Sequence, residues 1–317
     1  MLGIKRITGA AGSAAEGEPG SWVSDAAREK FMAAYERVFA LWPQPCEEFD
    51  LETATATTRV HAYRPHPGGE PVVLLSAFNA ASWYPHVAAL GKDGPVYGID
   101  MPGDANPSIP RALMTPPAAC AAWLDELLAQ LSDRPAHLVG FSYGGWVAMN
   151  QAIRAPGRVA SITLLDPAGL TGLDARFWWW LSISGLASMT PMPVRRHLAR
   201  WLDSPAMLQP ELMTLMWAAI RGYRAEPKFP GVLTDDELRA ITVPALLITG
   251  ARSAMLTPAE ARARGNLMPH AQVVIVPGSH GGFNRIDEVN DRIAAFITAH
   301  ATEPQAAQPA RPPAAEQ

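Results

Sequence analysis

The chain has few cysteines, no long uninterrupted apolar run and no excess of positive charge. Only two of its 317 residues are cysteine, Cys46 and Cys120, and they show no metal-binding spacing. Neither a disulfide-stabilised secreted domain nor a structural metal site is therefore expected. The net charge of −4 gives no reason to expect a nucleic-acid partner. The most apolar uncharged stretch, residues 177–194, is broken by two prolines and a glycine, so no membrane span is expected.

The composition is typical of a globular enzyme, with 48% apolar and 18% charged residues. The length allows one large domain with an insertion. The amino-terminal residues lack the apolar segment of a secretory signal, which favours a cytoplasmic protein. Residues 1–20 are expected to be flexible. Residues 301–317 are rich in Pro, Ala, Gln and Glu and are expected to be disordered.

Short apolar runs alternate with helical patterns through most of the chain. Strands are predicted at 46–52, 58–63, 72–76, 96–100, 136–140, 159–165, 244–249 and 272–276. Helices are predicted at 21–42, 116–131, 144–155, 258–267 and 283–300. This alternation predicts an α/β fold with a mainly parallel, eight-stranded, doubly wound sheet that opens with an antiparallel hairpin. Ligands of such sheets bind beyond the carboxyl ends of the strands.

One region interrupts the alternation. Residues 170–232 show helical patterns and no strand, and they are rich in tryptophan and methionine. We interpret them as a helical cap inserted between the sixth and seventh strands, with core segments at 21–169 and 233–300. Trp178, Trp179 and Met216 are candidate substrate-binding residues in an apolar pocket. The alternative is a helical insertion whose apolar faces simply pack on the core.

The segment Gly140-x-Ser142-x-Gly144 follows a predicted strand and precedes a predicted helix. This context is typical of a nucleophile elbow, a sharp turn that holds a serine hydroxyl clear of the backbone. The turn is crowded, and the two glycines leave room for it. Ser142 is therefore the candidate nucleophile.

A serine nucleophile needs a base that takes its proton. His280 is the best candidate, because it lies on a glycine-rich loop directly after the last predicted strand. That loop is expected at the same edge of the sheet as Ser142. His86 and His270 also lie near predicted loops and remain alternatives by position.

Together these residues resemble the α/β-hydrolase family from about residue 45 to 299. The resemblance depends on the elbow, on Asp100-Met-Pro-Gly103 after the fourth strand and on Pro277-Gly-Ser-His280-Gly. Further details are similar to small bacterial carboxylesterases, namely Trp83-Tyr84-Pro85, Ser108-Ile109-Pro110 and Thr234-Asp-Asp-Glu-Leu238. The resemblance implies a Ser–His–acid triad that hydrolyses esters without a cofactor or a metal ion.

The chain departs from this family at the acid. Family members usually carry Asp or Glu three residues after the glycine that closes the seventh strand, where this chain has Ser253. The family's alternative position follows the sixth strand, and Asp166 stands there. Asp166 is therefore the candidate acid, with a turn-forming role before proline as its other interpretation. Asp174 is a weaker candidate, and a Ser–His dyad is a further alternative.

A second departure concerns the oxyanion hole. Family members usually have His-Gly after the third strand, where this chain has Ser76 and Ala77. The backbone N–H groups of Phe78 and Tyr143 are the candidate donors, because a backbone donor does not depend on the side chain. The side chains of Ser76 and Asn79 are candidates for facing the substrate.

The sequence thus predicts a serine hydrolase that cleaves a small ester or thioester with an apolar moiety through an acyl-enzyme on Ser142. Acyl transfer would use the same residues. Two other classes stay open: a lyase, cyclase or isomerase on the same fold, and a ligand-binding protein with a vestigial site. Epoxide or haloalkane hydrolysis is disfavoured, because related enzymes need a carboxylate where Ser142 stands. The sequence does not indicate an oligomeric state.

Overall fold

The computed structural model describes most of the chain. The described residues are 19–66, 68–76, 78–114, 116–225, 230–280, 282–283 and 285–301. Nearly all of the two ends for which flexibility was predicted, 1–20 and 301–317, lies outside the described residues.

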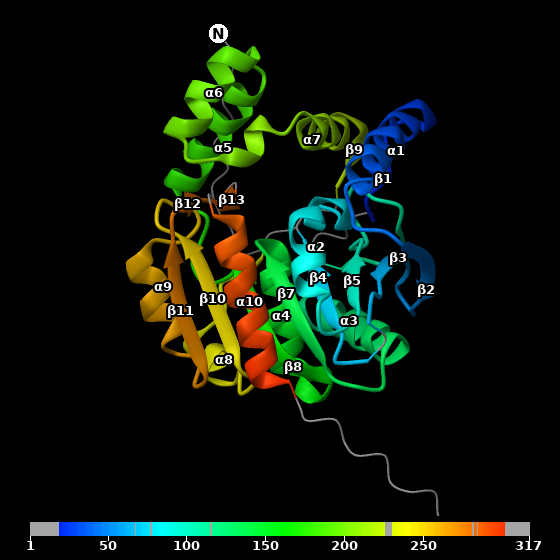
Figure 1. Ribbon diagram of the computed structural model, residues 1–317, viewed down its shortest axis with the longest axis vertical. Helices are drawn as coiled ribbons and strands as arrows, with labels where there is room; N and C mark the ends of the chain where they lie inside the picture. Colours follow the sequence, from blue (N-terminus) through cyan, green and yellow to red (C-terminus); the bar gives the residue numbers. More distant parts are fainter. Residues whose placement is uncertain are drawn as a thin grey trace, which may run out of the picture.

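A mainly parallel sheet forms the centre of the molecule (Figure 1). Within the described ranges it has nine strands, eight of which form one path. Across the sheet the order is β11 (Ala271–Val276), β10 (Ala245–Gly250), β8 (Val159–Leu165), β7 (Ala136–Phe141), β4 (Val72–Leu75), β5 (Val96–Ile99), β3 (Ala56–Tyr63) and β2 (Cys46–Glu52). β3 runs antiparallel to β2 and β5, and the other neighbours on the path are parallel. The predicted fold class is confirmed, with the short β6 (Ile109–Pro110) as an unpredicted addition beside β3.

Strand β4 shows how the sheet joins two layers of helices. Successive side chains of a strand face opposite sides. Val72 and Leu74 pack in one buried cluster with α2 (Tyr84–Leu90) and α10 (Ile286–His300), which lie in front of the sheet in Figure 1. Val73 and Leu75 pack on the other side. The helices there are α3 (Pro117–Leu131), α4 (Tyr143–Arg154), α8 (Asp235–Arg239) and α9 (Pro258–Gly265).

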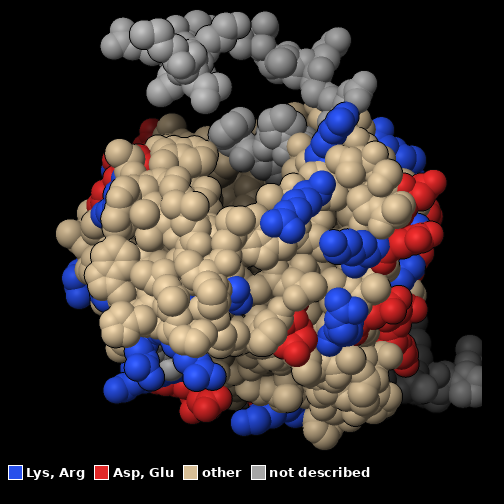
Figure 2. Space-filling view, turned by 90° about the horizontal axis from the view of Figure 1, so that it is seen from above, with Lys and Arg blue, Asp and Glu red and all other residues tan. Residues whose placement is uncertain are grey.

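The helices of residues 175–222 stand above the carboxyl ends of the strands (Figure 1). They are α5 (Ala175–Ser188), α6 (Met192–Trp201) and α7 (Pro210–Gly222), with a 3-10 turn, η3, at Pro205–Leu208. Two further 3-10 turns are η1 (Ala80–Trp83) and η2 (Pro156–Arg158). Seen from above, much of this face is uncharged, and Lys, Arg, Asp and Glu side chains gather toward its right and lower parts (Figure 2).

The prediction that residues 170–232 contain no strand is wrong. β9 (Tyr223–Arg224) pairs antiparallel with β1 (Ser21–Trp22). Two residues show no periodicity, and the partner strand lies at the far end of the chain, so no local pattern could reveal this pair. α1 (Asp25–Phe39) begins after Ser24, whose hydroxyl accepts the backbone N–H of Ala27. The predicted helix at 21–42 is therefore shorter at both ends.

α1 also connects the sheet to the helices above it. Phe31 and Ala34 of α1 share a buried cluster with Leu215 and Ala218 of α7. The same cluster includes Ala81 of η1, close to the carboxyl end of β4. The segment 25–39, assigned from the sequence to the core, thus packs against both parts of the molecule.

Candidate active site

Ser142 lies at a strained turn between β7 and α4. Its backbone has φ 53° and ψ −115°, a region that residues with a side chain rarely occupy. A Cβ atom on Gly140 would overlap the carbonyl oxygen of Gly144, and a Cβ atom on Gly144 would overlap the carbonyl oxygen of Leu75. The two glycines are therefore needed for the close packing of strand, turn and helix, as the nucleophile-elbow interpretation requires.

His280 lies next to the serine hydroxyl. It follows β12 (Gly278–Ser279), which pairs with β13 (Gly282–Phe283) in a small hairpin after β11. Its Nε2 atom is 3.2 Å from the Oγ atom of Ser142. Both side chains are largely buried, so the hydrogen bond lies in an environment of low dielectric constant.

Asp166 lies on the other side of the imidazole. Its Oδ2 atom is 3.2 Å from His280 Nδ1, which is hydrogen-bond distance for an orienting carboxylate. Asp166 is fully buried directly after β8, and its other oxygen accepts the hydroxyl of Thr249. Its φ of 46° marks a second unusual backbone position at this edge of the sheet. The structure therefore brings Ser142, His280 and Asp166 together in one hydrogen-bonded row.

The other two acid-position candidates form hydrogen bonds elsewhere. Ser253 Oγ accepts the backbone N–H groups of Met255 at 3.0 Å and Leu256 at 3.2 Å, so this hydroxyl closes its own turn. Asp174 caps α5 by accepting the N–H of Phe177 at 3.1 Å. Ser253 therefore stabilises a local turn, and Asp174 caps a helix.

The two candidate oxyanion donors belong to different segments, Tyr143 to the elbow and Phe78 to the loop after β4. Tyr143 is the first residue of α4, where backbone N–H groups point out of the helix end. The N–H of Phe78 donates to Ser76 Oγ at 3.3 Å, and the Phe78 side chain is 48% exposed. Asn79 caps η1, because its Oδ1 accepts the N–H of Ser82 at 3.3 Å. Ala77 lies outside the described residues.

A buried polar cluster holds this loop in place. Asp100 Oδ1 accepts the N–H of Ala80 at 2.7 Å, directly after Asn79. Its Oδ2 accepts the hydroxyl of Tyr35 at 2.7 Å and lies 3.1 Å from His61 Nε2. Burial, and then the neighbouring Asp100 carboxylate, raise the pKa of Tyr35 well above its usual range. Asp100 therefore joins α1, β3 and the loop that carries Phe78.

Three aromatic rings surround His280, and the sequence did not single them out. The Phe141 ring stacks on the imidazole at a centroid distance of 5.3 Å. Phe177 and Trp180 of α5 contact it edge-on at 5.9 and 5.5 Å. Phe177 and Trp180 are three residues apart, which places them on one helix face, and that spacing was a signal that the sequence offered.

The predicted substrate-binding residues of segment 170–232 lie in other contacts. The Trp178 ring packs edge-on against Phe177, and the Trp179 ring packs edge-on against Trp201. Trp178 and Trp179 are each about half exposed. Met216 is half-buried on α7. Their role in substrate binding stays a prediction.

The described residues contain no candidate metal site and no candidate membrane span. No group of three His, Cys, Asp or Glu side chains in these ranges could bind a metal ion. No helix in the same ranges is long and apolar enough to cross a membrane. The contact between Ser142 and His280 has the geometry that nucleophilic and acid–base chemistry would need.

Comparisons with known proteins identify the family to which the chain belongs. A model of the alpha/beta hydrolase family matches residues 72–295. Carboxylesterase YbfK of Bacillus subtilis is 30% identical over 293 residues, which cover 84% of this chain and 93% of that protein. Its solved structure, with 29% identity, superposes with a TM-score of 0.74 over 86% of this chain and 99% of that chain.

A second solved structure is equally similar. Naproxen esterase (carboxylesterase NP) of Bacillus subtilis is 28% identical, with a TM-score of 0.74 over 87% of this chain and 99% of that chain. The family match spans β4 to α10 and includes both Ser142 and His280. The chain therefore belongs to the alpha/beta hydrolase family.

Proposed function

We propose that this protein is a serine carboxylic ester hydrolase whose nucleophile is Ser142. The observation that carries the proposal is the row of two hydrogen bonds, each 3.2 Å long, from Ser142 through His280 to Asp166. A serine hydroxyl is a poor nucleophile at neutral pH, and this row supplies both the base and the group that orients it. The similarity to two proteins named carboxylesterases supports an ester as the substrate.

Acylation begins when Ser142 Oγ attacks the carbonyl carbon of the ester. His280 Nε2 takes the hydroxyl proton, and Asp166 stabilises the positive charge that develops on the imidazole. The negative charge on the former carbonyl oxygen is held by the backbone N–H groups of Phe78 and Tyr143. The Phe78 N–H turns from Ser76 Oγ to the oxyanion at this step. His280 then gives its proton to the leaving alkoxide, and the ester C–O bond breaks.

Deacylation repeats the same steps with water as the nucleophile. His280 takes a proton from water, and the resulting hydroxide attacks the acyl carbon. The tetrahedral intermediate collapses when Ser142 Oγ leaves and recovers its proton from His280. The products are a carboxylic acid and an alcohol. A thioester follows the same path, with a thiol as the first product.

The substrate is proposed to have an apolar moiety. Phe141, Phe177 and Trp180 surround the His280 imidazole, so a group bound beside it meets aromatic carbon rather than charge. α5 brings two of these rings from the segment 170–232, which we propose to act as a cap over the site. Ser76, Asn79, Trp178, Trp179 and Met216 remain proposed substrate contacts.

We also propose a cytoplasmic location. The two cysteines are present as thiols, as is usual in a reducing compartment. Burial, followed by the nearby Glu48, raises the pKa of Cys46 to about 11, which keeps this thiol protonated and unreactive at neutral pH.

A fluorophosphonate probe tests the nucleophile directly, because it phosphonylates only an activated serine. Wild-type protein should be labelled once, and peptide mapping should place the label on Ser142. Ser142→Ala should abolish both the labelling and the hydrolysis of p-nitrophenyl butyrate. Wild-type protein unfolded in urea serves as the control for non-specific labelling.

Two results would contradict the proposal. One is folded wild-type protein that neither reacts with the probe nor hydrolyses any p-nitrophenyl ester. The other is Ser142→Ala protein that keeps its ester turnover, since the reaction would then use another group.

A further inference from the structure

A cavity lies between α1 and the helices α5, α6 and α7, and neither Ser142 nor His280 lines it. It has a volume of about 500 Å³, within the range of small-molecule sites. Its lining comes from α1, the end of α5, α6 and α7. α5 contacts His280 through Trp180 and reaches this cavity at Ser188, eight residues later. That spacing corresponds to about 12 Å along the helix axis, so the two sites are distinct.

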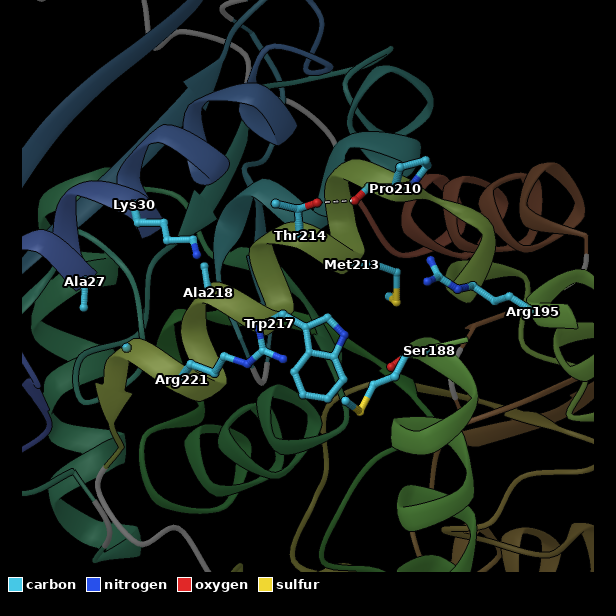
Figure 3. A pocket seen from close by; sticks show the side chains of 12 residues that line it. Ala27, Lys30, Ser188, Arg195, Pro210, Met213, Thr214, Trp217, Ala218 and Arg221 are labelled. Atoms are coloured by element: carbon cyan, nitrogen blue, oxygen red, sulfur yellow. Dashed lines mark hydrogen bonds between the residues drawn. The ribbon is translucent and has the colours of Figure 1, made fainter. Parts of the chain in front are cut away.

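The cavity combines positive charge with an apolar floor. Lys30 of α1, Arg195 of α6 and Arg221 of α7 line it, and Figure 3 shows their side chains extending toward it from different sides. Met213 and Trp217 lie between them. The described lining residues include no Asp or Glu, so the cavity itself carries only positive charge.

The three cations keep donors for a ligand. Among the described residues, none of them forms an ion pair with a carboxylate within 4.0 Å. Arg195 donates to the carbonyl oxygen of Thr190 through Nε at 3.2 Å and Nη2 at 2.9 Å. A guanidinium has five N–H groups, so others remain for an anion. The Arg221 guanidinium lies 5.0 Å from the centre of the Trp217 ring, which orients it over the apolar floor.

We propose that this cavity is a binding site for a small amphipathic monoanion, a carboxylate with an apolar body. Arg195 and Arg221, on opposite sides of Met213 and Trp217, supply the positive charge that attracts the carboxylate, and Lys30 adds to it at the rim. The apolar body lies against Met213, Trp217 and the largely exposed side chain of Met189. A purely inorganic anion fits less well, because it would leave this apolar surface uncovered. Ester hydrolysis releases acids of this class. Binding of the acid in this cavity does not depend on Ser142 or on hydrolysis at Ser142.

Calorimetric titration with decanoate tests the proposal. The titration uses full-length Ser142→Ala protein as well as wild type, so that turnover and reaction at Ser142 play no part. Saturable one-to-one binding is expected in both. Each of Arg195→Gln and Arg221→Gln should weaken it about threefold and the double variant about tenfold, since partly exposed ion pairs are individually weak. Decan-1-ol and acetate should each bind at least about tenfold more weakly than decanoate.

Arg196→Gln is the matched control, because Arg196 neighbours Arg195 on α6 but does not line the cavity. Circular dichroism confirms that each variant is folded. The proposal is overturned if decanoate shows no saturable binding, if decan-1-ol binds as tightly, or if Arg196→Gln weakens binding as much as Arg195→Gln. Binding to phosphatidylglycerol vesicles without binding of free decanoate would also overturn it, in favour of a lipid surface. Labelling of Ser142 is measured separately, so failure here leaves the proposed hydrolase untouched.

Discussion

Asp166→Asn removes one negative charge from the centre of the proposed site and changes little of its shape. The carboxylate is fully buried between Thr249 and His280, so an amide of equal size can occupy the same space. An amide nitrogen facing His280 Nδ1 would favour the wrong tautomer of the imidazole. An amide oxygen facing it would keep the tautomer but supply no full charge. Both outcomes weaken His280 as the base.

The size of the effect follows from the distance between the groups. Asp166 Oδ2 lies 3.2 Å from His280 Nδ1. Two unit charges at that separation attract by about 5 kcal/mol at an effective dielectric constant of about 20. Both charges are delocalised, which lengthens their mean separation and reduces the attraction to about 4 kcal/mol. Because about 1.4 kcal/mol changes a rate tenfold, kcat should fall about a thousandfold. KM should change by less than about threefold, because the imidazolium forms only along the reaction path.

The assay is steady-state hydrolysis of p-nitrophenyl butyrate by the wild type and two variants. Ser253→Ala is the matched control for the usual acid position, where the hydroxyl accepts two backbone N–H groups instead of orienting His280. Its kcat should stay within about threefold of the wild type, while its unfolding free energy falls by about 1 kcal/mol. Thermal melting verifies that both variants are folded.

A result in which Asp166→Asn keeps more than about a tenth of the wild-type kcat would refute the role assigned to Asp166. A Ser–His dyad would then be the better description. If Ser253→Ala loses as much activity as Asp166→Asn, the acid has been assigned to the wrong position.

Three further predictions concern the cap, the elbow and the pH dependence of stability. Trp180→Ala removes a ring that contacts the imidazole of His280 and should lower kcat about tenfold, whereas Leu186→Ala, at a side chain that is 64% exposed on the same helix, should change it less than twofold; equal effects in the ester assay would contradict the role of the contact between α5 and His280. Gly144→Ala would place a Cβ atom in the backbone of β4 and should lower the urea unfolding free energy by about 3 kcal/mol. Gly172→Ala, where a Cβ atom meets nothing within 4 Å, should cost less than about 1 kcal/mol, and an equal loss would refute the packing argument. Burial lowers the pKa of His86 from 6.5 to about 4. As the pH falls, the imidazole of His86 is therefore protonated in the unfolded chain before it is protonated in the folded protein. The contribution of neutral His86 to the unfolding free energy is complete above pH 6.5 and is lost as the pH falls toward 4. The unfolding free energy measured over this range should therefore decrease as the pH is lowered. The decrease should be up to about 3 kcal/mol smaller in His86→Gln, and an unchanged pH profile would show that His86 does not cause it.

The strands could be predicted well because their signal is local. Runs such as Val72–Leu75 are apolar throughout, as strands buried on both faces must be, and the structure places strands at all eight predicted sites. The short pairs β1–β9 and β3–β6 gave no such signal, because two residues cannot show a period. Their existence depends on segments that meet only in the folded chain.

The surroundings of His280 were less accessible from the sequence. Tryptophan enrichment marked α5 as a source of aromatic contacts but did not say which face of the helix turns inward. Phe177 and Trp180 reach His280, while Trp178 and Trp179 point to other rings. A helix with apolar residues on all sides leaves its orientation to packing, and that packing involves α6 and the loop after β11. The cationic cavity was equally hidden, since Lys30, Arg195 and Arg221 lie on three separate helices.

The sequence by itself determined the sheet and the turn at Ser142, because apolar strand runs and the glycines at 140 and 144 act over a few residues. Only the tertiary structure decided which group meets His280. Asp166, Asp174 and a Ser–His dyad were all open. A hydrogen bond between residues 114 positions apart depends on how the whole sheet places β8 and the loop after β11. Side-chain chemistry is local, whereas the distances that turn it into a site are set by packing.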